Sequence, residues 1–159
     1  MNRETPEELL QLHLAAEEGD HGFSYAKPDS HGGKAMVRLA RSEIIKSWVQ
    51  VVKKSGGENN LHYHRNTDTF WMVLKGRVRF YGPDDEVLGE FGPHEGTITP
   101  QYSRYWFENI GDEDLELLQV AAYRPGGEGA RIDVSAQKLD VSSVERFDAN
   151  VPRVGKQRA

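Results

Sequence analysis

Two histidines one residue apart, His62 and His64, are the feature that most constrains this chain. A glycine-rich segment that begins at Gly56 precedes them, and an apolar run over residues 70–74 follows, closed by a turn at Gly76. This pattern predicts a strand, a turn and a second strand. Because alternate residues of a strand point to the same face, both imidazoles can bind one metal ion.

The spacing around this pair resembles the first motif of the cupin superfamily. That motif reads Gly, five residues, His-x-His, three or four residues, Glu, six residues, Gly. Gly56, His62, His64 and Gly76 fall on this spacing. The resemblance implies that both histidines are metal ligands.

The glutamate of this motif is replaced in the present chain. Its position is occupied by Thr69, with Asp68 beside it. In a regular strand Asp68 points to the face opposite to the expected ligand, whereas a bulge in the loop at residues 65–67 would turn it inward. Asp68 is therefore a candidate metal ligand, and Thr69 a candidate contact to a bound water or a substrate.

A second stretch, residues 92–109, resembles the other cupin motif. Pro100 and Asn109 stand where the family has them. However, Tyr102 replaces a glycine of the motif, and Tyr105 replaces its third metal-binding histidine. Two of the four usual ligands are therefore kept and two are changed.

The resemblance covers roughly residues 36–123 and implies the double-stranded β-helix, or jelly-roll barrel, of the cupins. The residues agree, because short strand patterns alternate with turns rich in Gly, Pro and Asp, as in antiparallel sandwiches and barrels. We expect one all-β domain in three parts. These are an N-terminal helix and arm (residues 1–35), the barrel (residues 36–123) and a C-terminal arm or tail (residues 124–159).

A short helix is expected before the barrel. Thr5 and Glu8 form a capping-box pair, and Pro6 occupies the first helical position. Apolar residues on one face predict that this helix, ending near Gly19, lies against the domain or a partner. In cupins such arms often add a strand to a neighbouring subunit, so the resemblance implies a homodimer.

Composition excludes several classes of site and partner. The 159-residue chain has no cysteine, which rules out disulfides and thiolate metal sites. A net charge of −5, without a basic stripe or a basic helix, argues against nucleic-acid and membrane partners. The N-terminus lacks an apolar signal core, and no long apolar run occurs. The expectation is a soluble cytoplasmic protein.

Tyr105 is the more informative of the two ligand replacements. A phenol ordinarily has a pKa near 10, but a bound cation favours the phenolate. Tyrosines of some cupin enzymes are thought to act as a ligand or a base. Tyr105 is thus a candidate third ligand, catalytic general base or hydrogen-bonding group over the substrate, with a barrel-lining aromatic as the alternative.

Further candidate substrate contacts come from the strands. Gln50 either points into the barrel or is exposed, and the pattern leaves both open. Gln119 interrupts the apolar run of the last barrel strand. Trp71 and other aromatic residues would form an apolar wall, which suits a small aromatic or hydrophobic molecule.

Three function classes follow. In the first, the protein is an enzyme with a divalent transition metal (iron, manganese, nickel or zinc) on His62 and His64, completed by Tyr105, Asp68 or water. It would act on a small organic molecule as an oxygenase, lyase or isomerase. The second is a metal-free acid–base isomerase, as in the sugar epimerases of this fold, and the third a non-catalytic small-molecule-binding protein. Retention of both histidines favours the first.

Overall fold

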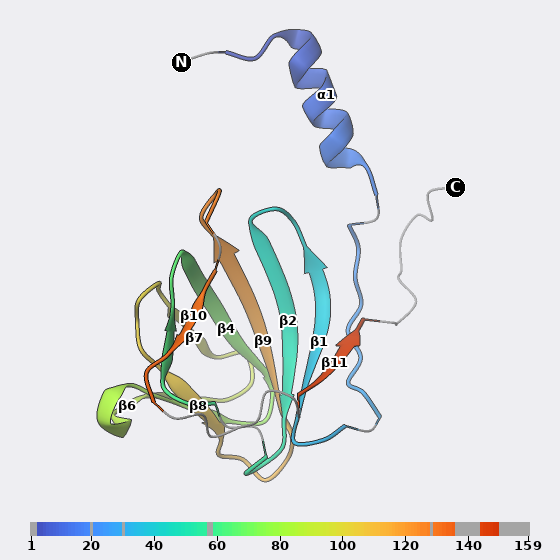
Figure 1. Cartoon of the computed structure of the whole chain (residues 1–159). Helices are drawn as coiled ribbons and strands as arrows, with labels where there is room; N and C mark the ends of the chain where they lie inside the picture. The colour runs from blue at the N-terminus through green and yellow to red at the C-terminus, as the bar shows by residue number, and fades with distance from the viewer. Residues whose placement is uncertain are drawn as a thin grey trace.

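The computed structural model describes residues 3–19, 21–29, 31–56, 59–127, 129–135 and 144–149. Within them the elements are α1 (Pro6–Glu17), β1 (Lys34–Arg41), β2 (Ile45–Val52), β3 (His62–His64), β4 (Thr67–Lys75), β5 (Val78–Tyr81), the 3-10 helix η1 (Pro83–Asp85), β6 (Val87–Phe91), β7 (Gly96–Thr99), β8 (Trp106–Asn109), β9 (Leu115–Tyr123), β10 (Arg131–Asp133) and β11 (Glu145–Asp148). The predicted all-β fold with one short N-terminal helix is confirmed (Figure 1).

The strands form one large and two small sheets. The large sheet has the order β11-β1-β2-β9-β4-β7, and the small ones pair β6-β5-β8 and β10-β3. All these pairings are antiparallel except β1 with β11. Both β10 and β11 come from the segment predicted as a C-terminal arm; β11 extends the large sheet, and β10 forms a small sheet with β3. The end of that segment, residues 150–159, lies outside the described residues.

Each face of the large sheet carries its own apolar cluster. Val52 and Trp71 contribute to the cluster on the inner face, which packs against β5 and β8 and closes the barrel. Val49 and Val51 contribute to the cluster on the outer face. Because strand side chains alternate, β2 supplies both faces, as its sequence predicts. The inner face is the one that positions the candidate site.

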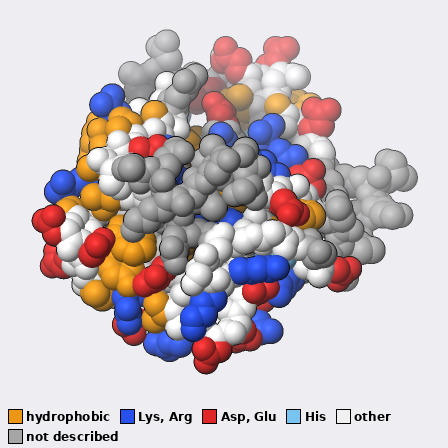
Figure 2. All heavy atoms as spheres, turned by 60° about the horizontal axis from the view of Figure 1, so that its bottom comes forward, with side chains coloured by type: hydrophobic (Ala, Val, Ile, Leu, Met, Phe, Trp, Pro, Cys, Tyr) orange, Lys and Arg blue, Asp and Glu red, His pale blue; other side chains and the backbone are white. Residues whose placement is uncertain are grey.

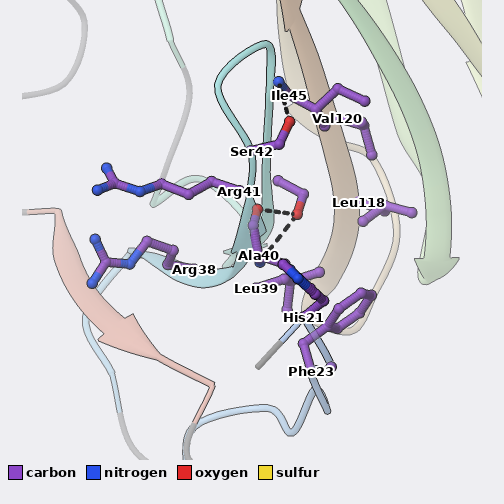
Figure 3. A pocket seen from close by; sticks show the side chains of 12 residues that line it. His21, Phe23, Arg38, Leu39, Ala40, Arg41, Ser42, Ile45, Leu118 and Val120 are labelled. Atoms are coloured by element: carbon purple, nitrogen blue, oxygen red, sulfur yellow. Dashed lines mark hydrogen bonds between the residues drawn. The ribbon is translucent and has the colours of Figure 1, made fainter. Parts of the chain in front are cut away.

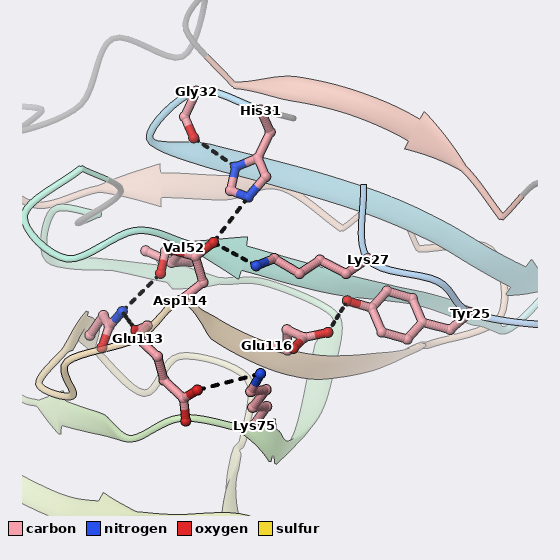
Figure 4. A network of polar contacts seen from close by, with 10 residues as sticks. Tyr25, Lys27, His31, Gly32, Val52, Lys75, Glu113, Asp114 and Glu116 are labelled. Carbon is pink, nitrogen blue, oxygen red and sulfur yellow. Dashed lines mark hydrogen bonds and ion pairs between the residues drawn. The ribbon is translucent and has the colours of Figure 1, made fainter. Parts of the chain in front are cut away.

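The N-terminal arm is fastened to the start of β9 by polar contacts (Figure 4). Tyr25 donates a hydrogen bond to Glu116, with 2.5 Å between the oxygens. Asp114 accepts from Lys27 at 2.8 Å and lies 3.4 Å from the buried imidazole of His31. His31 therefore anchors the arm, and it does not join the histidine pair on β3.

Helix α1 projects from the barrel (Figure 1). Its predicted capping box is present, because Thr5 Oγ1 accepts from the Glu8 N–H and the Glu8 carboxylate accepts from the Thr5 N–H. None of its residues is buried, and Leu9, Leu10 and Leu12 are about half exposed. Of the two predicted alternatives, the domain or a partner, the single chain does not show the first, and contact with a partner stays a prediction.

The surface shows mixed charge. On the face in Figure 2, acidic and basic side chains are interspersed, and hydrophobic side chains gather at the left edge. Among the described residues, no helix combines the length and apolarity needed to cross a membrane.

Tyr102 adopts a backbone conformation that residues other than glycine rarely adopt. Its φ is +68°, at the position where the second motif has a glycine. Its N–H donates to the carbonyl of His64 at 2.8 Å, so this turn also fixes the end of β3. The side chain is 60% exposed and stacks on Tyr63.

We therefore expect Tyr102→Gly to be more stable than Tyr102→Ala by about 1 kcal/mol, because only alanine keeps the Cβ that makes this conformation costly. Both variants lose the ring, so the stacking on Tyr63 cancels in the comparison. Urea denaturation measures both free energies of unfolding. Equal values would mean that the turn relaxes and stores no strain.

Candidate functional site

The structure brings His62, His64 and Tyr105 together. His62 and His64 lie on β3, and the backbones of His62 and Tyr105 exchange two hydrogen bonds, at 3.1 and 3.0 Å. The ring centre of His62 is 5.2 Å from that of His64 and 4.5 Å from that of Tyr105. The ring centres of His64 and Tyr105 are 6.4 Å apart. The three rings therefore form one cluster, which lies where β3 meets the segment that precedes β8.

The protonation of His62 follows from one contact. Its Nδ1 lies 2.7 Å from the carbonyl oxygen of Asn60, which can only accept, so Nδ1 carries the hydrogen and Nε2 keeps a lone pair. The side chain is 2% exposed, and burial lowers its pKa to about 3, with a contribution from Arg131. Burial and Arg131 also lower the pKa of His64. The lowered pKa values keep both side chains, buried His62 and half-buried His64, as neutral imidazoles, the form that binds a metal.

Tyr105 is held as a neutral phenol. Burial raises its pKa to about 12, although a hydrogen bond with Thr99 acts in the opposite direction. Thr99 in turn accepts from the indole N–H of Trp71 at 2.9 Å. The ring packs against Trp71 and Phe80, with centres 6.0 and 6.1 Å away. Tyr105 is thus both a wall residue and a neighbour of His62.

Asp68 does not join this cluster. Its side chain is exposed, and Oδ1 accepts a hydrogen bond from the backbone N–H of Gln101 at 2.8 Å. The register of β4 against β9 runs without a bulge past this residue, so Thr67 and Thr69 point inward and Asp68 outward. The bulge that would have turned Asp68 inward is absent from this strand, and the structure gives no support to Asp68 as a ligand.

The four predicted substrate contacts all lie on the inner face. Thr69 and Trp71 are 3% and 2% exposed on β4, and Trp71 is directly opposite Gln119 of β9. Gln50 is 5% exposed and donates from Nε2 to Gln119 Oε1 at 2.7 Å. Of the two alternatives for Gln50, the structure selects the inward one.

Two charged residues beside the histidines were not predicted. Strand β10 places Arg131 opposite His64 and Asp133 opposite His62, on the same face. The Arg131 guanidinium donates to Asn60 Oδ1 at 2.7 Å and to Asp133 at 3.0 Å. The sequence predicts a strand at residues 131–135, but no local signal indicates that it pairs with β3.

Lys34 was likewise not predicted. It begins β1 on the inner face, is 7% exposed, and places Nζ 5.3 Å from the ring centre of Phe107. Burial lowers its pKa to about 8, with contributions from Arg131 and Arg146. The sequence pattern of β1 does not distinguish a buried lysine from a solvated one.

The donor set fits a metal only in part. Two imidazoles bound to one ion through bonds of about 2 Å have ring centres roughly 5 Å apart, close to the observed 5.2 Å. The contact of His62 Nδ1 with a backbone carbonyl is also the usual outer support of a metal-binding histidine. Yet the described parts of the chain contain no group of three or more His, Asp or Glu side chains that could hold a metal ion together. A metal here would have two imidazoles and an adjacent phenol.

A separate cavity of about 620 Å³ lies on the outer face (Figure 3). His21 and Phe23 of the arm border it together with Leu118 and Val120 of β9. Leu118 points away from the barrel interior, so this cavity does not open onto the histidine pair. His21 accordingly lies apart from the site.

Comparison with known proteins places these features in context. The family model described as "Cupin domain" matches residues 48–121. An uncharacterized conserved protein with a double-stranded beta-helix domain from Klebsiella pneumoniae has a similar structure, with a TM-score of 0.58 at 16% identity, covering 74% of this chain and 100% of that one. No curated protein matches the sequence.

Two further structures are similar. The Cnp3 cupin domain of Schizosaccharomyces pombe has a TM-score of 0.55 at 17% identity and covers 64% of this chain and 74% of that one. Oxalate decarboxylase of Lactobacillus farciminis, in a formate complex, has a TM-score of 0.51 at 15% identity. The match covers 70% of this chain and 33% of that one. At these identities the likeness shows the fold alone.

Proposed function

We propose that the chain, whose residues 48–121 match the cupin domain model, is a cupin and a metal-dependent enzyme acting on a small organic molecule inside the barrel. One observation carries the proposal. The imidazoles of His62 and His64 have centres 5.2 Å apart, and the Asn60 carbonyl leaves Nε2 of His62 available as a ligand. Open positions on such an ion suit an oxygenase, a lyase or an isomerase.

The electrostatics favour this proposal over unaided acid–base catalysis. An efficient general acid or base has a pKa near the working pH. The pKa of His62 lies near 3 and that of Tyr105 near 12, both far from neutrality. Burial thus weakens both groups as unaided proton carriers, whereas metal binding needs the neutral imidazole that burial favours.

Each residue then has a role. His62 and His64 would hold the ion, which would act as a Lewis acid on a substrate oxygen. Tyr105 would orient the substrate through its hydroxyl, which Thr99 fixes. Trp71 and the aromatic rings packed against it exclude water from the inner end of the barrel.

A non-catalytic binding protein is the second candidate. It is favoured by the packing of Trp71, Phe80 and Phe107, whose ring centres lie 5.3 to 5.7 Å apart and fill part of the interior. A barrel that binds a ligand without a metal would need neither imidazole as a ligand. Metal content distinguishes the two candidates.

The test is elemental analysis by mass spectrometry of protein purified without a metal-affinity tag. We expect close to one equivalent of a single transition metal per chain, as purified or after incubation with iron, manganese, nickel or zinc. Protein that takes up none of the four would contradict the metal-dependent proposal and favour the binding one.

Tyr105→Phe should keep its metal, with less than a tenfold change in affinity. The hydroxyl that it removes is bonded to Thr99, and both imidazoles remain. Metal titration followed by isothermal calorimetry measures this, with His64→Ala as the variant that should lose affinity. A loss in Tyr105→Phe as large as in His64→Ala would make Tyr105 a third ligand.

We also propose that the chain forms a homodimer in the cytoplasm. The half-exposed leucines of α1 support an intermolecular partner for the helix. Sedimentation equilibrium of the full chain and of a variant with Leu9 and Leu12 changed to Gln tests the dimer, since only the wild-type should associate.

A further inference from the structure

Lys34 is a buried cation for which the described part of the chain supplies no counter-ion. No described residue forms a hydrogen bond or an ion pair with it, and its ammonium lies 5.3 Å from the ring centre of Phe107. A buried ammonium is costly unless it is paired. Its position on the inner face directs this charge at the barrel interior.

Gln50 presents an unsatisfied buried oxygen on the same face. Its Nε2 donates to Gln119, but Oε1 is buried and has no hydrogen-bond partner. Lys34 lies opposite Val52, and Met36 opposite Gln50, so Lys34 and Gln50 are diagonal neighbours across β1 and β2. Such neighbours are about 7–8 Å apart, within the reach of one small molecule. One donor cation and one acceptor oxygen therefore lie side by side.

A cavity of about 290 Å³ lies at the edge where β1 meets β11. Met36, Trp48 and the guanidinium-bearing Arg38 and Arg146 line it, together with Phe147 and Asp148. Neither Lys34 nor Gln50 lines this cavity, but Met36, which does, lies opposite Gln50 on β2 and opposite Arg146 on β11. Asp148 pairs with Arg38 at 2.8 Å. The remaining charge around the cavity is positive, which favours an anion.

We propose that the inner face around Lys34 and Gln50 binds a small carboxylate that also carries a hydroxyl or amino group. The carboxylate pairs with the Lys34 ammonium, and the hydroxyl or amino group donates to Gln50 Oε1. The Lys34 ammonium thereby gains a counter-ion, and Gln50 Oε1 gains a hydrogen-bond donor.

Arg131 connects this subsite to the histidine pair. Its positive charge lowers the pKa of Lys34 as well as those of His62 and His64. A carboxylate held at Lys34 would therefore lie in the same positive field as the histidines. The assignment of this anion as the substrate rests on the proposed function, whereas its binding does not.

The experiment is isothermal titration calorimetry of the full-length protein as purified, at pH 7, with three probes of similar size. Lactate has both groups, propionate lacks the hydroxyl, and lactamide lacks the charge. We expect lactate to bind at least tenfold more tightly than either of the others. Lys34→Met should weaken lactate binding about ten- to a hundredfold, the usual effect of losing a hydrogen bond to a charged group.

Two further variants sharpen the test. Lys53→Met removes the same charge from an exposed lysine one residue beyond β2, and it should bind lactate like the wild-type. Gln50→Leu should bind lactate and propionate equally, because only the hydroxyl contact is lost. Circular dichroism of each variant confirms that it is folded.

Equal affinities for lactate and lactamide, unchanged lactate binding in Lys34→Met, or no lactate binding at tens of millimolar would each overturn the proposal. The metal content of the same samples is measured separately. A metal-containing protein that does not bind lactate would refute only the anion subsite. A protein that binds lactate through Lys34 but takes up no metal would refute only the proposed metal site.

Discussion

His62→Ala is expected to lower the affinity for a divalent transition metal by more than about a hundredfold. Loss of a group that merely supports a ligand already costs ten- to a hundredfold, and His62 is one of only two imidazoles in the site. Its ring is fixed by the Asn60 carbonyl and by burial, so no neighbouring histidine can replace it. Competitive titration against a chelating dye measures the change.

Two controls separate metal loss from unfolding. His13→Ala removes an exposed histidine of α1 and should bind metal like the wild-type. His62→Ala itself leaves the Asn60 carbonyl without its donor, at a cost of about 1–3 kcal/mol, so its circular dichroism must be recorded. A folded His62→Ala protein with unchanged metal affinity would remove the histidine pair from the function.

Lys34→Met is expected to abolish a rise in stability that the wild-type shows at alkaline pH. The pKa of Lys34 falls from 10.5 to about 8 on folding. Between these values the unfolded chain binds the proton and the folded one does not, so the free energy of unfolding increases with pH. From pH 6.5 to 9.5 the wild-type should gain about 2 kcal/mol relative to Lys34→Met.

At pH 7 the same variant should be more stable than the wild-type by about 1–3 kcal/mol. Replacing a buried unpaired charge by an apolar side chain of similar shape removes its desolvation cost, and the lost contact with Phe107 offsets part of the gain. Urea denaturation across this pH range measures both effects. Parallel pH profiles for wild-type and Lys34→Met would show that the ammonium is solvated.

A stability gain in Lys34→Met would have a functional meaning. A buried cation that costs stability and finds no counter-ion among the described residues is explained if a ligand supplies one. The anion titrations and the stability profiles therefore test the same residue in independent ways. Lys53→Met, which changes an exposed lysine, should alter neither.

Local signals in the sequence predicted the secondary structure of most described elements. The capping box of Thr5 and Glu8 defined the start of α1, and the alternation of Val49 and Gln50 defined the two faces of β2. These signals act over a few residues, through hydrogen bonds and strand geometry that do not depend on the rest of the chain. Of the two surfaces predicted for α1, the domain is not the one that it contacts in the single chain, and a partner stays a prediction, because an apolar helix face does not specify the surface that it meets.

The sequence likewise predicted some residues of the candidate site correctly and one, Asp68, without support from the structure. His62, His64 and Tyr105 were predicted from motif spacing, and the fold places their rings together. Asp68 needed a bulge that only the register between β4 and β9 could reveal, and the register has none there. Whether the three residues bind metal stays a prediction.

By itself the sequence determined the barrel class, the histidine pair and the inward or outward direction of most strand residues, because these depend on residue type and on the two-residue period of a strand. Only the tertiary structure decided the surroundings of the histidines. Strand β10 brings Arg131 from almost seventy positions along the chain to lie opposite His64, and β1 buries Lys34 over Phe107. Such neighbours arise from strand pairing between distant segments, which local residue patterns do not specify, and they set the charge that a ligand meets.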